Sequence, residues 1–353
     1  MTASSAQVRD VRQAYRRFVD HGRWDHAARL VAALEDEAIL RERIEIETWV
    51  EPLLAESEVT AGTHAAILLG IAANGAMVRG DLEHARALAV QAHDAMDRGA
   101  APSYVASNVR FLISVIAEVS ETGAFGGGRV THLRRLHEYS ESTGDPLGAA
   151  LAEFDDVLAR TTAGRATEGA AAAVRLKRLG RATRSPLVES MAHLCLAWVR
   201  SAINPGRAAD HTTDAIALAR RARCTLVRRH AERTLESLRG LLPDADHQQA
   251  LVDAMARVTG AAQLGQREQT LQEIVALVPI LVALGQWREA AYVVGMLDRS
   301  IWTGSNVVRR ERERLITLLG RAEFDRYSRP GRRASWTELV PLLETRIAGI
   351  TPE

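Results

Sequence analysis

The sequence has little of several residue types, and each shortage excludes a class of protein. Only two cysteines occur, Cys195 and Cys224, which are too few for the disulfide framework of a small secreted domain. Aromatic residues make up 5% of the chain, and alternating runs of β-branched and aromatic residues are nearly absent, so strand signals are weak. The longest apolar run, 274–285, is interrupted by Pro279 and is too short to span a bilayer.

Net charge is almost absent as well. The 45 basic and 44 acidic residues give a formal charge of +1, which supplies no bulk attraction to nucleic acid or to an anionic membrane. Lys177 is the only lysine, which we attribute to the codon bias of a high-GC genome. The first 18 residues carry charges throughout and have no apolar core, unlike a secretory signal peptide. We therefore expect a soluble, cytoplasmic protein.

Alanine is abundant, and it favours helices that approach one another closely. Hydrophobic residues make up 47% of the chain, enough for a sizeable core. Apolar residues recur at helical spacing in segment after segment, as at Val11, Tyr15 and Phe18. We therefore predict an all-α fold. The expected helices include 104–121, 129–142, 147–161, 166–179, 185–201, 208–222, 225–239, 247–260, 267–284, 307–319 and 335–348.

A turn motif recurs at 21–30, 79–88, 163–172 and 284–293, with glycine followed five residues later by a small residue. The glycine can end one helix in the left-handed conformation, and an acidic residue then lies in the first turn of the next. Turns are expected near 22, 80, 125, 164, 206, 244, 285 and 331, so from 80 onward the interval is roughly 40 residues. This predicts a right-handed α-solenoid of stacked, tetratricopeptide-like hairpins in a single domain, 1–353. Within it we expect atypical repeats at 1–60, regular repeats at 61–300 and a capping repeat at 301–353.

The tail at 318–344 carries a spaced pattern of Leu319-Gly320, Phe324, Gly331, Ser335 and Leu339-Val340. This pattern resembles the closing segment of the helical-repeat region in actinobacterial signal-transduction ATPases and LuxR-type transcriptional regulators. Residues 14–34 are similar to the first repeat after the ATPase in those proteins. The resemblance implies a non-enzymatic regulatory sensor or protein-interaction array. The chain has no P-loop, cyclase segment or evident DNA-reading helix pair, so we expect an isolated module or a free-standing relative.

In tetratricopeptide-type arrays the first helix of each hairpin lines the concave face, so polar residues inside those helices are candidate ligand contacts. Asparagine can bond a peptide backbone, and arginine can hold a carboxylate. The competing interpretation is that these side chains face solvent or satisfy helix ends. We expect a protein, peptide or small-effector partner, possible homo-oligomers and no membrane. The candidates are Asn74, Asn108, Arg110, Asp155 and His193, with Glu153 and Asp156 nearby.

Signals for chemistry are sparse. The glycines at 126–128 follow no strand signal and lack the Lys-Ser/Thr of a phosphate-binding loop. His193 and Cys195 lie two residues apart, and Cys224 comes much later without a Cys-x-x-Cys motif, so no metal site is predicted. No nucleophile elbow is present. We therefore predict no cofactor, no catalytic residue and no enzymatic activity.

An arginine-rich stretch at 220–239 supports an alternative, a DNA-associated transcriptional regulator. Arg221, Arg228 and Arg229 could share a helix face with Arg233. Glutamates 232 and 236 dilute that charge, and the whole chain is neutral. A solvated helix face is therefore favoured over a nucleic-acid groove, and nucleic acid is an unlikely partner for this chain alone.

Overall fold

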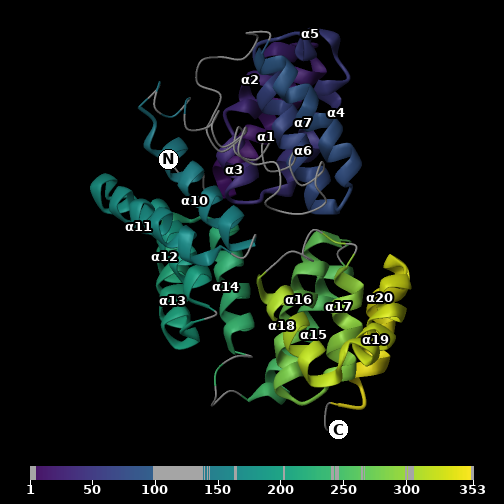
Figure 1. Cartoon of the computed structure of the whole chain (residues 1–353). Coiled ribbons are helices and arrows are strands. Elements are labelled where there is room, and N and C mark those ends of the chain that lie inside the picture. Colours follow the sequence, from purple (N-terminus) through teal and green to yellow (C-terminus); the bar gives the residue numbers. More distant parts are fainter. Residues whose placement is uncertain are drawn as a thin grey trace.

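A computed structural model describes residues 5–97, 138, 140, 142, 144–162, 165–201, 203–239, 242, 246–263, 265, 267–298, 300 and 306–350. These residues form eighteen α-helices and no strand (Figure 1), which confirms the predicted all-α class. None of the helices in this part of the chain combines the length and the hydrophobicity needed to cross a bilayer.

The helices fall into three groups, and each surrounds its own buried core (Figure 1). The N-terminal group consists of α1 (Ser5–Asp20), α2 (Trp24–Ala32), α3 (Glu35–Ile39), α4 (Ile44–Leu54), α5 (Ser57–Thr60), α6 (Ala65–Arg79) and α7 (Leu82–Asp97). The central group consists of α10 (Pro146–Thr162), α11 (Ala166–Thr183), α12 (Pro186–Arg200), α13 (Pro205–Ala222) and α14 (Thr225–Arg239). The C-terminal group consists of α15 (His247–Gln263), α16 (Arg267–Ala283), α17 (Trp287–Leu297), α18 (Asn306–Leu319), α19 (Arg321–Arg333) and α20 (Trp336–Ile347).

Regular stacking is clearest from α10 to α16. Each helix of the central group packs on the next, and α10, α12, α14 and α16 also contact one another in series. These four helices begin at Pro146, Pro186, Thr225 and Arg267, so the interval is roughly 40 residues, as the turn pattern predicts. Small residues of the central group, such as Ala173 on α11 and Ala197 on α12, are fully buried and allow close approach.

Glycine ends three of the helices as expected. Gly22, Gly80 and Gly285 all have positive φ angles, and the Gly80 N–H donates to the Met77 carbonyl at 2.9 Å. Arg184 and Arg223 end α11 and α13 in the same left-handed conformation, which the turn motif did not indicate. The turn expected near 206 comes earlier, because α13 already begins at Pro205, and the turns expected at 125, 164 and 244 lie outside the described residues.

The prediction of a turn near 331 is wrong, because Pro330 and Gly331 both lie inside α19. Gly331 has no Cβ atom, so the backbones of α17 and α19 can touch at this position. A Cβ atom on Gly331 would lie 2.2 Å from the Tyr292 carbonyl oxygen, and one on Gly295 would lie 2.0 Å from the Ser328 carbonyl oxygen. Helices α17 and α19 therefore pack backbone to backbone through this pair of glycines.

The other residues of the tail pattern also have structural roles. Gly320 precedes α19 with a φ of 80°, and the Phe324 ring is 2% exposed in the C-terminal core. Ser335 forms a capping box at the start of α20, in which its backbone N–H donates to the Glu338 carboxylate at 3.0 Å. Leu339 is buried in the same core. These residues therefore end and pack the C-terminal group.

The N-terminal group contacts both the central and the C-terminal group. The three groups therefore do not form an open array in which only neighbours along the chain touch. The Leu226 N–H donates to the Leu40 carbonyl at 3.1 Å, which joins α14 to the end of α3. Helix α6 contacts α16, and a Cβ atom on Gly80 would lie 2.5 Å from the Arg267 Cβ atom. This departs from an array in which each repeat touches only its neighbours. The handedness, the tetratricopeptide-like identity and the domain ranges stay predictions.

Candidate functional site

A cleft of about 500 Å³ opens where the N-terminal and central groups meet. One wall is formed by residues 37–45, around the link between α3 and α4, and the other by residues 219–228, around the link between α13 and α14. Its volume lies in the range of small-molecule binding sites. Charged side chains dominate the lining, namely Arg41, Arg43, Arg220, Arg223 and Arg228 with Glu37, Glu42 and Glu45.

Two unusual backbone conformations shape the walls of this cleft. Glu42 and Arg223 have φ angles of 51° and 53°, in the left-handed region that few non-glycine residues occupy. Arg223 ends α13 and turns the chain into α14, and Glu42 turns it from α3 into α4. The Leu40 carbonyl then accepts from the Leu226 N–H and from the Cys224 thiol, whose sulfur lies 3.7 Å away. The two walls are therefore tied together beneath the cleft.

Arg41 pairs closely with Glu37, whereas three other arginines of the cleft are only loosely neutralised. Arg43 lies 3.4 Å from Glu37 and 3.5 Å from Glu45, and Arg220 and Arg228 lie 3.5 and 3.9 Å from Glu232. All four separations exceed the usual length of an N–H···O hydrogen bond. These three guanidinium groups therefore keep N–H donors for another acceptor. With five arginines against three glutamates in the lining, the cleft favours an anion.

Asn74 lies inside the N-terminal group and not on an open surface. Its side chain is buried and donates to Glu47 on α4 at 3.3 Å, and Glu47 is 3.6 Å from Arg79. Burial raises the pKa of Glu47 to about 7, although Arg79 and Asn74 act in the opposite direction. Asn74 therefore satisfies a buried carboxyl group in this structure.

The acidic residues of α10 also bond within the fold. Asp155 is buried, and Glu153 accepts two hydrogen bonds from Arg175 of α11 at 2.7 and 2.8 Å. Asp156 accepts one from Arg160 at 2.7 Å. The pairing of Glu153 with Arg175 helps to join α10 to α11. The candidates Asn108 and Arg110 lie outside the described residues.

The arginine-rich stretch at 220–239 is not one helix, which corrects the shared face expected for its arginines. Helix α13 ends at Ala222 and α14 begins at Thr225, so Arg221 lies on a different helix from the other three. Arg229 pairs with Glu42, and Arg233 donates to Glu273 of α16 at 2.8 Å with only 11% of its side chain exposed. Arg228 lines the cleft. Nucleic-acid binding stays a prediction, without a single arginine face to carry it.

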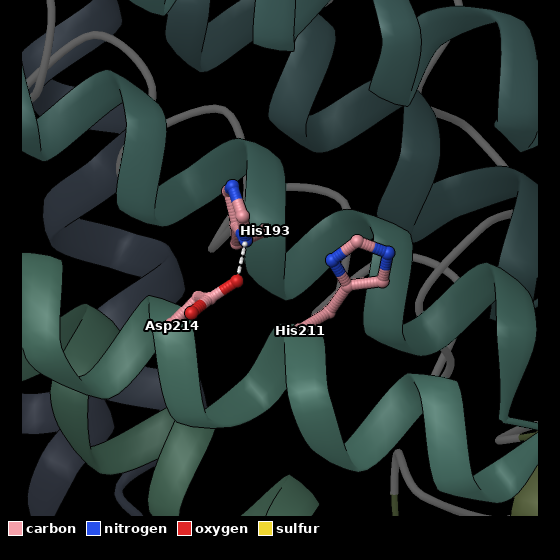
Figure 2. Close-up of side chains that lie close together, drawn as sticks. All are labelled: His193, His211 and Asp214. Atoms are coloured by element: carbon pink, nitrogen blue, oxygen red, sulfur yellow. Dashed lines mark ion pairs between the residues drawn. The ribbon is translucent and has the colours of Figure 1, made fainter.

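His193 belongs to a cluster that includes His211 and Asp214. His193 lies on α12, and the other two lie on α13 (Figure 2). The His193 Nδ1 atom is 3.1 Å from an Asp214 carboxylate oxygen, and one ligand atom from each residue lies within 4.8 Å of the others. The His211 Nε2 atom contacts Arg200. The sequence singles out His193 but not its partners, because they lie on the next helix and form no local Cys-x-x-Cys or His-x-x-x-His motif with it.

Burial disfavours the charged form of both imidazoles in this cluster. Burial lowers the pKa of His193, and Lys177 adds to the effect. Burial lowers the pKa of His211 to about 4, with further contributions from Arg200 and His193. A neutral imidazole has one ring nitrogen with a lone pair and one with a proton.

Fold and sites together define an all-α protein of packed helical hairpins with a cationic cleft and a separate histidine–aspartate cluster. No family model and no curated protein matches the chain.

Proposed function

We propose that the chain is a non-enzymatic helical-repeat module of a regulatory protein, and that it senses a small effector bearing a carboxylate or phosphate group. The effector binds in the cleft between residues 37–45 and 219–228. The observation that carries this proposal is the cluster of arginines whose ion pairs are too long to occupy their donors. Guanidinium groups recognise carboxylates and phosphates through paired N–H donors.

The position of the cleft suggests how binding is reported. Its walls belong to different helix groups, so an anion bound to Arg43 and Arg220 at once links the N-terminal and central groups. A ligand that prefers the linked arrangement shifts the population toward it. The packed hairpins and the resemblance to repeat regions of regulators support this sensory role. An acidic protein or peptide segment would use the same arginines, whereas a concave-face partner and homo-oligomers stay predictions.

The first test is direct binding to small anions. We expect inorganic phosphate, citrate or a nucleoside triphosphate to bind saturably in calorimetry and to raise the melting temperature, with weaker binding at high salt. The double variant Arg220→Ala/Arg228→Ala should lose about tenfold or more in affinity, because each lost contact to a charged group is worth roughly 1.5–3 kcal/mol.

Arg86→Ala is the matched control, because Arg86 is exposed on α7 and does not line the cleft. Its affinity should equal that of the original chain. Saturable binding that the double variant leaves unchanged would contradict the proposal, as would no saturable binding of any of the three anions.

A further inference from the structure

We propose that His193, His211 and Asp214 form a binding site for a divalent transition-metal ion, best matched by Zn²⁺. The site is separate from the arginine cleft and does not depend on the function proposed for it. His193 comes from α12, and the other two residues come from one face of α13 because they are three residues apart. Helices α12 and α13 pack closely along their length, so the backbone fixes all three positions.

The donor set selects the class of metal. Two imidazole nitrogens and one carboxylate oxygen suit Zn²⁺, whereas Mg²⁺ and Ca²⁺ prefer oxygen ligands alone. Three protein ligands with a fourth position for water is the arrangement of open zinc sites. Asp214 leaves that position accessible, because 60% of its side chain is exposed.

The spacing of the donors fits a small metal ion. Tetrahedral Zn²⁺ with bonds near 2.0 Å places neighbouring ligand atoms about 3.3 Å apart. The His193 Nδ1 atom and the Asp214 oxygen are already 3.1 Å apart. The third donor lies within 4.8 Å of both, so a shift of the His211 ring by roughly 1 Å to 2 Å closes the triangle.

A second observation points to a ligand between these residues. The Nδ1 atoms of His193 and His211 are both buried, and neither makes a hydrogen bond of good geometry among the described residues. Figure 2 shows one ring nitrogen of each histidine turned toward the space beside Asp214. Buried polar atoms are normally satisfied. A cation bound to both Nδ1 atoms and to the carboxylate would satisfy all three groups at once, once the ring protons have moved to Nε2.

Arg200 opposes metal binding by His211. It contacts the Nε2 atom of His211, and an arginine can only donate, so His211 must hold its proton on Nδ1. A metal on Nδ1 moves that proton to Nε2, where it faces the Arg200 donors. The partly exposed Arg200 side chain must then swing away. Glutamine at this position could instead accept the Nε2 proton, as outer-shell partners of metal-bound histidines do.

The test is Zn²⁺ titration of the full, untagged chain after treatment with a chelator, followed by calorimetry and by the absorption spectrum with Co²⁺. We expect one equivalent of Zn²⁺ per chain and a four-coordinate Co²⁺ spectrum. Asp214→Asn and His211→Ala should each weaken binding at least tenfold. Arg200→Gln should tighten binding several-fold, a change in the opposite direction that misfolding cannot produce.

Asp210→Asn is the matched control, because Asp210 is exposed on α13 one turn before Asp214. Its affinity should not change. Asp214→Asn alters an exposed side chain, so its melting temperature should stay close to that of the original chain. A loss of Zn²⁺ affinity in this variant then reports the lost ligand and not unfolding. No stoichiometric Zn²⁺ binding would overturn the proposal. Binding that persists in both Asp214→Asn and His211→Ala would overturn it too, because surface histidines would then hold the metal.

Discussion

Glu47 shows how a single buried carboxyl group couples folding to pH. The residue is 6% exposed, and burial raises its pKa from 4.5 to about 7. The folded chain therefore holds this proton more tightly than the unfolded chain between those two pH values. The stabilising contribution is fully present below about pH 4.5 and is lost as the pH rises through about 7.

Glu47→Gln should remove this pH dependence. The pKa change corresponds to about 3 kcal/mol, so the chain should lose stability of that order between pH 4.5 and pH 8 relative to the variant. Glutamine keeps the size of the side chain and its contact with Asn74. Denaturant unfolding of both proteins across this range gives the difference. Glu51→Gln, at an exposed position of the same helix, is the control, and its free energy of unfolding should change with pH as that of the original chain does. If the free energies of all three proteins changed with pH in parallel, the raised pKa of Glu47 would be contradicted.

At this scale the sequence indicates unusual residues but not their partners. Asn74 stands out as a polar residue in an apolar helix, yet its partner Glu47 lies 27 residues earlier on another helix. His193 stands out for the same reason, and its partners lie 18 and 21 residues later. Only the packing of α4 on α6 and of α12 on α13 brings these side chains together. The His211-x-x-Asp214 spacing is the one local signal available.

The contact between α17 and α19 depends on two glycines. Gly331→Ala places a Cβ atom 2.2 Å from the Tyr292 carbonyl oxygen, so the two backbones must separate. We expect a loss of about 3 kcal/mol or more, at the upper end of overpacking effects. Thermal or denaturant unfolding of the full chain measures it.

Gly260→Ala is the matched control, because Gly260 lies in α15 and a Cβ atom added there would meet no atom within 4 Å. It should raise stability by roughly 0.5–1 kcal/mol through helix propensity. Equal effects of the two substitutions would show that Gly331 does not mediate a backbone contact.

Local patterns predicted the helices better than they predicted how the helices end. The glycine turns at 22, 80 and 285 follow from local chemistry, because glycine adopts positive φ without strain. Arg184 and Arg223 make the same turn without that signal, at the C-terminal ends of α11 and α13. At Gly331 a turn was predicted where the helix continues, because glycine also occurs where two helices pack closely.

At the scale of the whole molecule, the three helix groups close on one another. Repeats of roughly 40 residues are visible in the sequence, and the central helices follow that interval. The contacts of Leu40 with Leu226 and of Gly80 with Arg267 are not visible there, because they join residues nearly 190 apart. The arginine cleft lies where the first of these contacts joins the two helix groups, which explains why no sequence pattern indicated it.

The central claim is that an anion bound in this cleft holds its two walls together. Hydrogen exchange of the full chain, measured with and without the tightest-binding of the three anions, tests this most directly. We predict joint protection of residues 37–45 and 219–228, and loss of that protection in Arg220→Ala/Arg228→Ala. Protection of only one wall, or protection confined to other helices, would contradict the account.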